Sequence, residues 1–358
     1  MKILIAFNHD LNPYVNVVIQ GLMQENCPVD TGTEKFWNAD LFDYDIVHIQ
    51  WPETLFDWRV PTPVELLFLR KRLKEVKQRA KVVYTRHNEV SHHANEHNAV
   101  ILGELYALLE SECDAMIHLG EPSRTACLNQ PGLCDKTHVV IPIPVYDELY
   151  SPFAHITRNE ARQRLGIPLN RKVVLAFGNF RYEREKQLVA DAYLATHDRR
   201  TYLLAPMWHK PRDYSFSVLH PMLFLRTLRT AAWGWWNQMA LGAKKNLSDE
   251  EVAVCFSAAD VVFIQRMDDL NSGNIPMAFY FKKVVVGPDV GNIGEALKST
   301  GNPVFDSRDS ASVRQALQQA LKLTTTDLGD KNHHFAMTHL TTRQIAAAHA
   351  ALYRLIES

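Results

Sequence analysis

The sequence has little cysteine and no long hydrophobic run. Its 358 residues include five cysteines with no C-x-x-C pair among them, which is typical of reduced thiols and not of a disulfide framework. No apolar stretch reaches the roughly 18 residues that a transmembrane helix needs. The first residues also lack the long apolar segment of a signal peptide. These absences predict a cytoplasmic protein.

Neither sign of charge is in excess. Lys and Arg number 39 and Asp and Glu number 40, so no basic field points to a nucleic-acid partner. Hydrophobic residues make up 46% and charged residues 22%, a composition typical of globular proteins and not of disordered chains. At about 150 residues per domain, the length predicts two domains.

The sequence does contain a regular alternation of short apolar runs with helical patterns. In the first half, strands are expected at residues 2–7, 45–50, 81–85, 115–119 and 138–141, with helices at 14–24, 63–79, 97–112 and 123–129. In the second half, strands are expected at 172–177, 201–205, 260–265, 283–286 and 303–305, with helices at 183–196, 248–258, 274–281 and 310–322. This alternation predicts an α/β protein with two Rossmann-like βαβ domains.

Prolines between residues 142 and 152 mark the expected domain boundary. We therefore expect one domain at 1–145 and a second at 146–340. Residues 341–358 form a strongly helical pattern with one apolar face, which would allow this last helix to pack back on the first domain.

The first domain has polar and aromatic residues after its expected strands, where ligands bind in open α/β sheets. Asn12, Pro13 and Tyr14 follow the first strand, and they fit either a capped helix start or a substrate-facing loop. Trp51 follows the second strand, near His48 and Glu53. Its face would suit a sugar ring, although a core position explains it equally well.

The loop after the third expected strand, residues 85–93, is rich in histidine. It contains His87, Asn88, His92 and His93. An imidazole can exchange a proton near neutral pH and can hydrogen-bond a sugar hydroxyl. Three interpretations remain open: substrate or catalytic contacts, structural polar contacts, and a metal site, for which the ligand spacing is not convincing.

Two loops of the second domain suit a diphosphate. Gly178 follows the first strand of this domain, and Arg181 and Arg184 come shortly after it. Glycine lets the backbone approach a ligand closely and guanidinium groups suit phosphate oxygens, whereas a solvated helix start with local ion pairs is the plainer interpretation. A second loop, 268–276, precedes a helix whose N–H groups could hold phosphate. Its small polar residues are Asn271, Ser272, Gly273 and Asn274.

These residues together resemble a GT-B glycosyltransferase, of the group with a family 1/family 4-like C-terminal domain. The segment from Asn271 to Pro276 and the following residues 283–293 resemble the donor-site helix of these enzymes and the strand and turn after it. Gly178, Arg181 and Arg184 resemble their G-x-x-R-x-x-K loop, with Arg184 in place of the usual lysine.

The first domain resembles a subgroup of bacterial polysaccharide enzymes. His87-Asn88 followed by His92 is similar to their HN-x-x-x-H acceptor-side loop, and Asn12-Pro13-Tyr14 is similar to another of their segments. The resemblance to the family covers nearly the whole chain.

The resemblance implies two Rossmann-like domains facing across a cleft and transfer of a sugar from a GDP- or UDP-linked donor. The acceptor would be a saccharide or lipid-linked saccharide in cell-surface polysaccharide assembly. Arg181 and Arg184 would neutralise the departing diphosphate, helped by Asn271, Ser272, Gly273 and Asn274. The acceptor side would include Asn12, Tyr14, Trp51 and Asn88, with His87 or His92 as general base in an inverting reaction. Neither a metal nor a cofactor would be needed besides the nucleotide sugar.

The chain departs from the family at the E-x7-E motif. Its glutamates would fall near positions 271 and 279, where this sequence has Asn271 and Phe279. Two alternatives therefore stand beside the transferase: a non-catalytic binding protein of the same fold, and a sugar-nucleotide epimerase, which needs no separate acceptor.

Residues 221–245 form a basic, aromatic segment at approximate helical spacing. Trp233, Trp235 and Trp236 lie close to two arginines and two lysines, a combination that suits an interfacial helix on the cytoplasmic face of an anionic membrane. Because tryptophan is usually well buried, an insertion packed in the core between two strands is the interpretation that the sequence favours.

Overall fold

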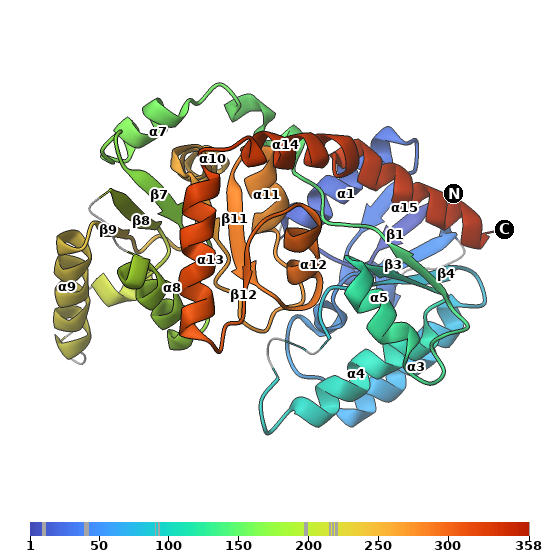
Figure 1. The fold of residues 1–358 in the computed structure, drawn as a ribbon. Helices are drawn as coiled ribbons and strands as arrows, with labels where there is room; N and C mark the ends of the chain where they lie inside the picture. Colours follow the sequence, from blue (N-terminus) through green and yellow to red (C-terminus); the bar gives the residue numbers. More distant parts are fainter. Residues whose placement is uncertain are drawn as a thin grey trace. The chain divides into compact units, whose positions relative to one another are not determined.

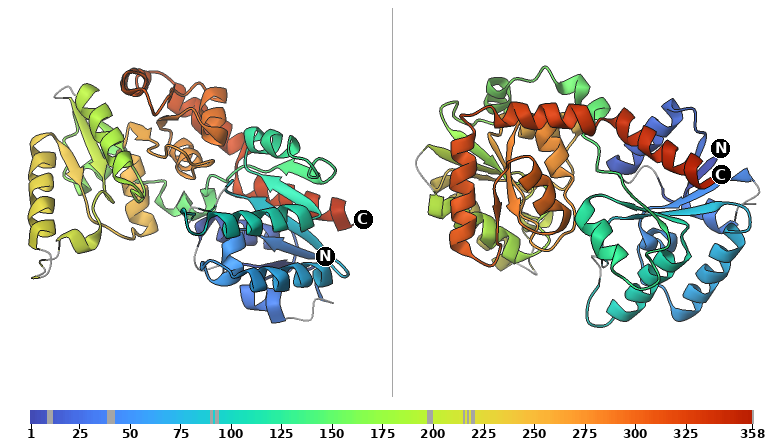
Figure 2. Two further views of the ribbon diagram at one scale, coloured as in Figure 1. Left: turned by 90° about the horizontal axis from the view of Figure 1, so that it is seen from below. Right: turned by 45° about the vertical axis from the view of Figure 1, so that its right-hand side comes forward.

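The computed structural model describes residues 1–8, 12–38, 43–89, 91, 94–196, 200–214, 216, 218 and 221–357. The chain forms two compact units, Met1–Pro144 with Leu340–Ser358, and Val145–His339. Each unit contains a six-stranded parallel sheet flanked by helices (Figures 1 and 2). The α/β architecture predicted from the alternating pattern is confirmed.

In the first unit the strand order is β2-β1-β3-β4-β5-β6. Strand β2 lies on one side of β1, and β3 and the later strands lie on the other side. The strand order therefore reverses at β1, and open α/β sheets bind their ligands at such a reversal. Its strands are β1 (Ile3–Ile5), β2 (Val29–Thr31), β3 (Ile46–Ile49), β4 (Lys81–Arg86), β5 (Ala115–His118) and β6 (Thr137–Val140). Its helices include α1 (Pro13–Gln24), α2 (Thr33–Asn38), η3 (Pro52–Phe56), α3 (Pro63–Val76), α4 (Ala99–Glu112) and α5 (Glu121–Leu128).

The end of the chain completes the first unit. Helix α15 (Thr342–Glu357) packs along α1, and the two helices lie side by side in Figure 1. Gly21 of α1 is where they approach most closely, since a Cβ there would lie 2.5 Å from the Cβ of Ala346. The buried residues of α15 include His349 and Tyr353, which the chain thereby brings next to strands more than 200 residues earlier.

In the second unit the strand order is β12-β11-β10-β7-β8-β9, so the order reverses between β7 and β10. Its strands are β7 (Lys172–Leu175), β8 (Thr201–Ala205), β9 (Met239–Leu241), β10 (Val261–Phe263), β11 (Val284–Pro288) and β12 (Val304–Phe305). Its helices include α6 (Asp147–Tyr150), η4 (Ser151–Phe153), α7 (Arg158–Arg164), α8 (Glu183–Thr196), η5 (Pro211–Tyr214), α9 (Pro221–Trp236), α10 (Asp249–Ala258), α11 (Asn274–Tyr280), α12 (Gly291–Ser299), α13 (Ser310–Leu323) and α14 (Leu328–His339).

The ten strands expected from apolar runs are all present, whereas β2 and β9 were missed. Each of these two edge strands has three residues. Asp30 interrupts the apolar pattern of β2, and β9 directly follows the helical pattern of α9. The first strand therefore lacks the continuous apolar run that identifies a buried parallel strand, and the pattern alone does not distinguish the apolar residues of the second from a continuation of the preceding helix.

Helix α9 is not packed in a core, so the interpretation that the sequence favoured for residues 221–236 is wrong. Figures 1 and 2 show α9 beside β9 at the edge of the second unit's sheet. Only Thr227 and Gly234 of this helix are buried, whereas Trp235 and Trp236 are 76% and 78% exposed. Gly234 permits this contact, because a Cβ there would lie 2.7 Å from Leu241. Among the described residues, no helix combines the length and the hydropathy required to cross a bilayer.

Candidate functional site

The second unit gathers its predicted diphosphate-binding residues at the carboxyl ends of β7 and β10. Arg181 lies between β7 and α8, and its Nη1 is 2.9 Å from both carboxylate oxygens of Asp269. Arg184, in the first turn of α8, donates from Nη2 to Asp268 Oδ2 at 2.5 Å. The two guanidinium groups predicted to bind phosphate are thus held by carboxylates of the loop after β10.

A buried ion pair supports the loop that carries Arg181. Arg266 Nη1 is 2.9 Å from Glu185 Oε1, and Arg266 Nη2 donates to the carbonyl of Asn179 at 2.8 Å. Glu185 also accepts a hydrogen bond of 2.7 Å from the backbone N–H of Arg181. Arg266 Nε lies 3.4 Å from Asp269, which joins the two ion pairs into one network. This network holds the backbone on both sides of the strand-order reversal.

The two predicted cations differ in how firmly they are held. The side chains of Arg181 and Asp269 are 35% and 18% exposed, and Asp269 is shared with Arg266. The side chains of Arg184 and Asp268 are 54% and 62% exposed. An exposed pair of this kind contributes at most about 1 kcal/mol, so Arg184 can exchange its carboxylate for another anion at little cost.

The loops after β7 and β10 are tied through one backbone carbonyl. Phe177 O accepts hydrogen bonds from Asn274 Nδ2 at 3.0 Å and from Gln265 Nε2 at 2.9 Å. Gly178 follows with φ = +98°, in the left-handed region that favours glycine. Gln265 Oε1 is buried and has no hydrogen-bond partner among the described residues.

The remaining predicted donor-site residues lie at the start of α11. Asn271 Oδ1 accepts a hydrogen bond of 2.7 Å from Asn292 Nδ2, and Ser272 O accepts from the N–H of Ile275. A Cβ on Gly273 would lie 3.4 Å from the hydroxyl of Tyr146. Phe279, where the resemblance implies a glutamate, is a core residue with 1% exposure. A ribose-binding carboxylate is therefore not supplied from this position.

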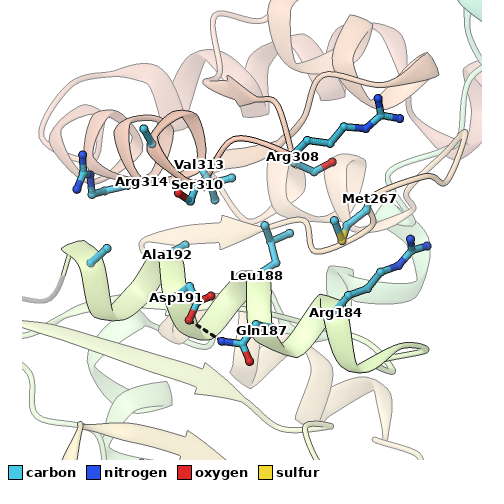
Figure 3. Close-up of a pocket in the computed structure, with 13 residues that line it drawn as sticks. Arg184, Gln187, Leu188, Asp191, Ala192, Met267, Arg308, Ser310, Val313 and Arg314 are labelled. Carbon is cyan, nitrogen blue, oxygen red and sulfur yellow. Dashed lines mark hydrogen bonds between the residues drawn. The ribbon is translucent and has the colours of Figure 1, made fainter.

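A cavity of about 590 Å³ adjoins Arg184, within the size range of small-molecule sites. Figure 3 shows Gln187, Leu188 and Asp191 on α8 opposite Ser310 and Val313 on α13. Met267, after β10, lies at the same end of the cavity as Arg184. Two further arginines, neither of which forms an ion pair with another described residue, also line it: Arg308 and Arg314.

In the first unit, three predicted residues meet at the carboxyl ends of β1, β3 and β4. His87 stacks on Trp51, with ring centroids 3.8 Å apart and planes at 12°. Tyr14 meets His87 edge-on, with centroids 5.2 Å apart. Asn12 is the N-cap of α1 and accepts a hydrogen bond of 2.9 Å from the N–H of Tyr14, as the capped-turn interpretation expected.

A hydrogen-bonded network connects this aromatic cluster to the end of the chain. His87 Nε2 is 2.8 Å from Gln50 Oε1, and because an amide oxygen only accepts, Nε2 carries the proton. Gln50 Nε2 lies 3.2 Å from His48 Nε2. His48 also contacts Thr85 Oγ1 and the hydroxyl of Tyr353, each at 2.7 Å. No local sequence pattern could associate Tyr353 with this site, because only the docking of α15 places it there.

The histidines of this network are neutral at physiological pH. Burial, with a smaller contribution from His349, lowers the pKa of His87 to about 3. Burial likewise lowers the pKa of His349 to about 4 and holds the pKa of His48 well below its usual value. The neutral form of His87 can accept a proton, but burial also makes it a weak base, because general-base catalysis favours a pKa near the working pH. Its catalytic role stays a prediction.

Of the other predicted residues of the histidine-rich loop, the structure describes Asn88. The side chain of Asn88 hydrogen-bonds the hydroxyl of Tyr106, which also donates to Glu53 Oε1 at 3.0 Å. Glu53 is 2% exposed, and its Oε2 has no hydrogen-bond partner among the described residues. His92, the second proposed general base, lies outside the described residues.

No protein-family model and no curated protein matches the chain. Solved structures do match over nearly its whole length. Sucrose-phosphate synthase from Thermosynechococcus elongatus is 16% identical, with a TM-score of 0.68 and coverage of 99% of this chain and 98% of the other. HepE of Anabaena, in complex with UDP and glucose, is 16% identical, with a TM-score of 0.68 and coverage of 98% and 99%.

The catalytic domain of starch synthase IV from Arabidopsis thaliana, bound to ADP and acarbose, is also similar. It is 11% identical, with a TM-score of 0.69 and coverage of 99% of both chains. These similarities, together with the two parallel sheets, show that the chain has the GT-B fold, as the sequence resemblance implied.

Proposed function

We propose that this protein is a glycosyltransferase that moves a sugar from a nucleoside-diphosphate sugar to a saccharide or lipid-linked saccharide of a cell-surface polysaccharide. The observation that carries this proposal is the convergence of Arg181 and Arg184 at the carboxyl ends of β7 and β10, where the strand order reverses. The nucleotide and sugar complexes of HepE and starch synthase IV support the same class of ligand.

In this proposal the donor diphosphate replaces the carboxylates of Asp268 and Asp269 as the partner of the two arginines. Asp268 and Asp269 each occupy one guanidinium, so two adjacent anionic groups already lie where two phosphates would bind. Guanidinium groups bind phosphate and carboxylate with the same fork of N–H donors. As the bond from sugar to phosphate breaks, negative charge grows on the diphosphate, and Arg181 and Arg184 stabilise it. We expect no metal to be needed for this step.

The acceptor binds to the first unit in this proposal. Partly exposed Trp51, packed against the buried rings of His87 and Tyr14, offers an aromatic face, as the apolar face of a sugar requires. Gln50 fixes the imidazole of His87 through Nε2, and we propose His87 as the group that would take a hydroxyl proton.

Product analysis separates this proposal from its alternatives. The protein is incubated with UDP-, GDP-, ADP- and dTDP-linked sugars, with and without a membrane lipid extract as acceptor. We expect release of nucleoside diphosphate and a new glycolipid only when the acceptor is present. Sugar conversion without acceptor would identify an epimerase, and nucleotide binding without any turnover would identify a binding protein; both outcomes contradict transfer.

We further propose that α9 places the second unit on an anionic lipid surface. Apolar residues are exposed along the whole helix: Met222 is 73%, Leu225 56%, Trp235 76% and Trp236 78% exposed. Sixteen residues from Pro221 to Trp236 include two arginines and no acidic residue. Exposed tryptophan with cationic neighbours is characteristic of helices that lie in the headgroup region of a bilayer. A lipid-linked acceptor would make such a membrane contact useful.

Vesicle flotation tests the lipid contact. The protein is floated with vesicles of phosphatidylglycerol and phosphatidylcholine, or of phosphatidylcholine alone. We expect it to float with the anionic vesicles only, and the double variant Trp235→Ser/Trp236→Ser to stay in solution. Phe68→Ser, which removes a ring that is 61% exposed on α3, is the matched control and should float like the wild type. Equal flotation of the tryptophan variant would contradict a contact through α9.

A further inference from the structure

Strand register places three side chains with nitrogen or sulfur donor atoms on one face of the first sheet. His118 and Met116 are two residues apart on β5, so their side chains point to the same face. Met116 is paired with His138 of β6, which brings that imidazole to this face as well. Helix α5 contacts both strands and places Cys127 among them, with Cys127 Sγ 3.5 Å from Met116 Sδ.

The nitrogen and sulfur atoms converge on one point. His118 Nε2 and His138 Nδ1 are 2.9 Å apart, and one donor atom from each of His118, Cys127 and His138 lies within 4.8 Å of the other two. Ligand atoms around a tetrahedral zinc ion lie about 3.3–3.8 Å apart, as its bond lengths to nitrogen and sulfur require. Small rotations of the two rings would therefore admit the ion.

His138 also has the outer hydrogen bond typical of a metal ligand. Its Nε2 is 2.8 Å from Leu133 O, and since a carbonyl only accepts, Nε2 carries the proton. The lone pair of neutral His138 is consequently on Nδ1, the atom that points toward His118. Metal-binding histidines usually donate their other N–H to a carbonyl or carboxylate in this way.

We propose that His118 Nε2, His138 Nδ1 and the thiolate of Cys127 form a zinc site, with Met116 Sδ beside the fourth position. Imidazole and sulfur donors without a carboxylate favour zinc over magnesium or calcium. Cys127 loses its thiol proton to water as the Zn–S bond forms, and no change of oxidation state is involved. The ion would link β5, β6 and α5 at the edge of the sheet, and so stabilise the folded first unit.

The number of zinc ions retained per chain tests this proposal. The full chain is loaded with Zn²⁺, passed over a chelating resin and analysed by mass spectrometry of the metal. We expect about one ion per chain for the wild type, and none for Cys127→Ser or His118→Ala. The control is Cys134→Ser, which removes an exposed cysteine of the same unit and should keep the ion. No zinc on the wild type, or equal zinc on Cys127→Ser, would overturn the site.

X-ray absorption of the zinc-loaded wild type tests the same site without a variant that could misfold. We expect a zinc shell with two nitrogen ligands and sulfur at the bond lengths of imidazole and thiolate. A shell made only of oxygen and nitrogen would overturn the proposal, because it would show zinc bound elsewhere. The melting temperature should rise with Zn²⁺ for the wild type and for Cys134→Ser, and stay unchanged for Cys127→Ser.

Discussion

The amide and imidazole side chains at the carboxyl ends of β3 and β4 in the first unit are buried and neutral, whereas the arginines after β7 and the aspartates after β10 in the second are charged and partly exposed. His87 is stacked on Trp51 and linked through Gln50 to His48. Arg184, by contrast, is paired with a carboxylate in solvent. Protonation of a buried, neutral histidine destabilises the network that contains it. An exposed ion pair can instead exchange its carboxylate for another anion. The first arrangement suits orientation of a sugar, and the second suits capture of an anion.

The largest expected difference between the two units is their loss of stability at low pH. In the unfolded chain His87 and His349 take up protons near pH 6.5, but in the folded unit their pKa values are about 3 and about 4. Their contribution to stability is therefore complete above pH 6.5 and decreases below it. At pH 5 the two histidines should together lower the free energy of unfolding of the first unit by about 4 kcal/mol.

Hydrogen exchange read by mass spectrometry at pH 7 and pH 5 measures this difference. Amides of β1, β3 and β4 should lose more protection at pH 5 than those of β7 and β10. The His349→Gln variant should lose about half as much protection between pH 7 and pH 5, because only one of the two histidines remains to be protonated. An equal loss of protection in both units would show that the buried histidines do not make the first unit acid-sensitive.

Substitutions at the two sites should affect different substrates of the transfer reaction, the donor in the second unit and the acceptor in the first. Arg181→Ala should lower kcat/KM for the donor about 100-fold, because hydrogen bonds to a charged group contribute about 1.5–3 kcal/mol each. Trp51→Ala should raise KM for the acceptor and leave donor binding unchanged. Steady-state rates with each substrate varied separately measure both effects. A donor defect in Trp51→Ala as large as that in Arg181→Ala would remove the division of roles.

Tyr353→Phe should destabilise the first unit without affecting the second. The substitution leaves His48 Nδ1 without its bond of 2.7 Å to the hydroxyl, in a fully buried position. Loss of such a partner costs about 1–3 kcal/mol. Urea unfolding followed by near-ultraviolet circular dichroism measures the change, with Tyr182→Phe, an exposed tyrosine of the second unit, as control. Nucleotide affinity should stay at the wild-type value.

The smallest effect is expected at Asp268. Asp268→Asn removes the carboxylate that competes for Arg184, so nucleoside diphosphate should bind about two- to fivefold more tightly, which corresponds to an exposed pair of less than about 1 kcal/mol. Asp269→Asn should weaken binding instead, because Asp269 joins Arg181 to Arg266, which is only 14% exposed. Calorimetric titration of each variant with one nucleoside diphosphate measures the two affinities. Equal affinities would contradict the proposal that Asp268 occupies the position of a phosphate on Arg184.

Part of the fold and of the candidate site could be predicted from the sequence. Apolar runs predict ten of the twelve described strands, and residues at their ends predict where Arg181 and His87 lie. The order of the strands depends on long-range pairing, so no local pattern shows that the loops after β7 and β10 are neighbours. The carboxylates that occupy the arginines and the contribution of Tyr353 follow from that tertiary arrangement. The exposure of Trp235 was missed because hydrophobicity alone predicts burial.

Calorimetric titration with UDP, GDP, ADP and dTDP tests the central claim most directly. The wild type should bind at least one of them at a single site. Arg181→Ala should bind the same nucleotide about 100-fold more weakly, as expected for loss of its charged hydrogen bonds. The matched control Arg70→Ala, which removes an exposed arginine of α3, should bind like the wild type. Wild-type affinity in Arg181→Ala, or no binding of any of the four, would contradict a diphosphate site at the ends of β7 and β10.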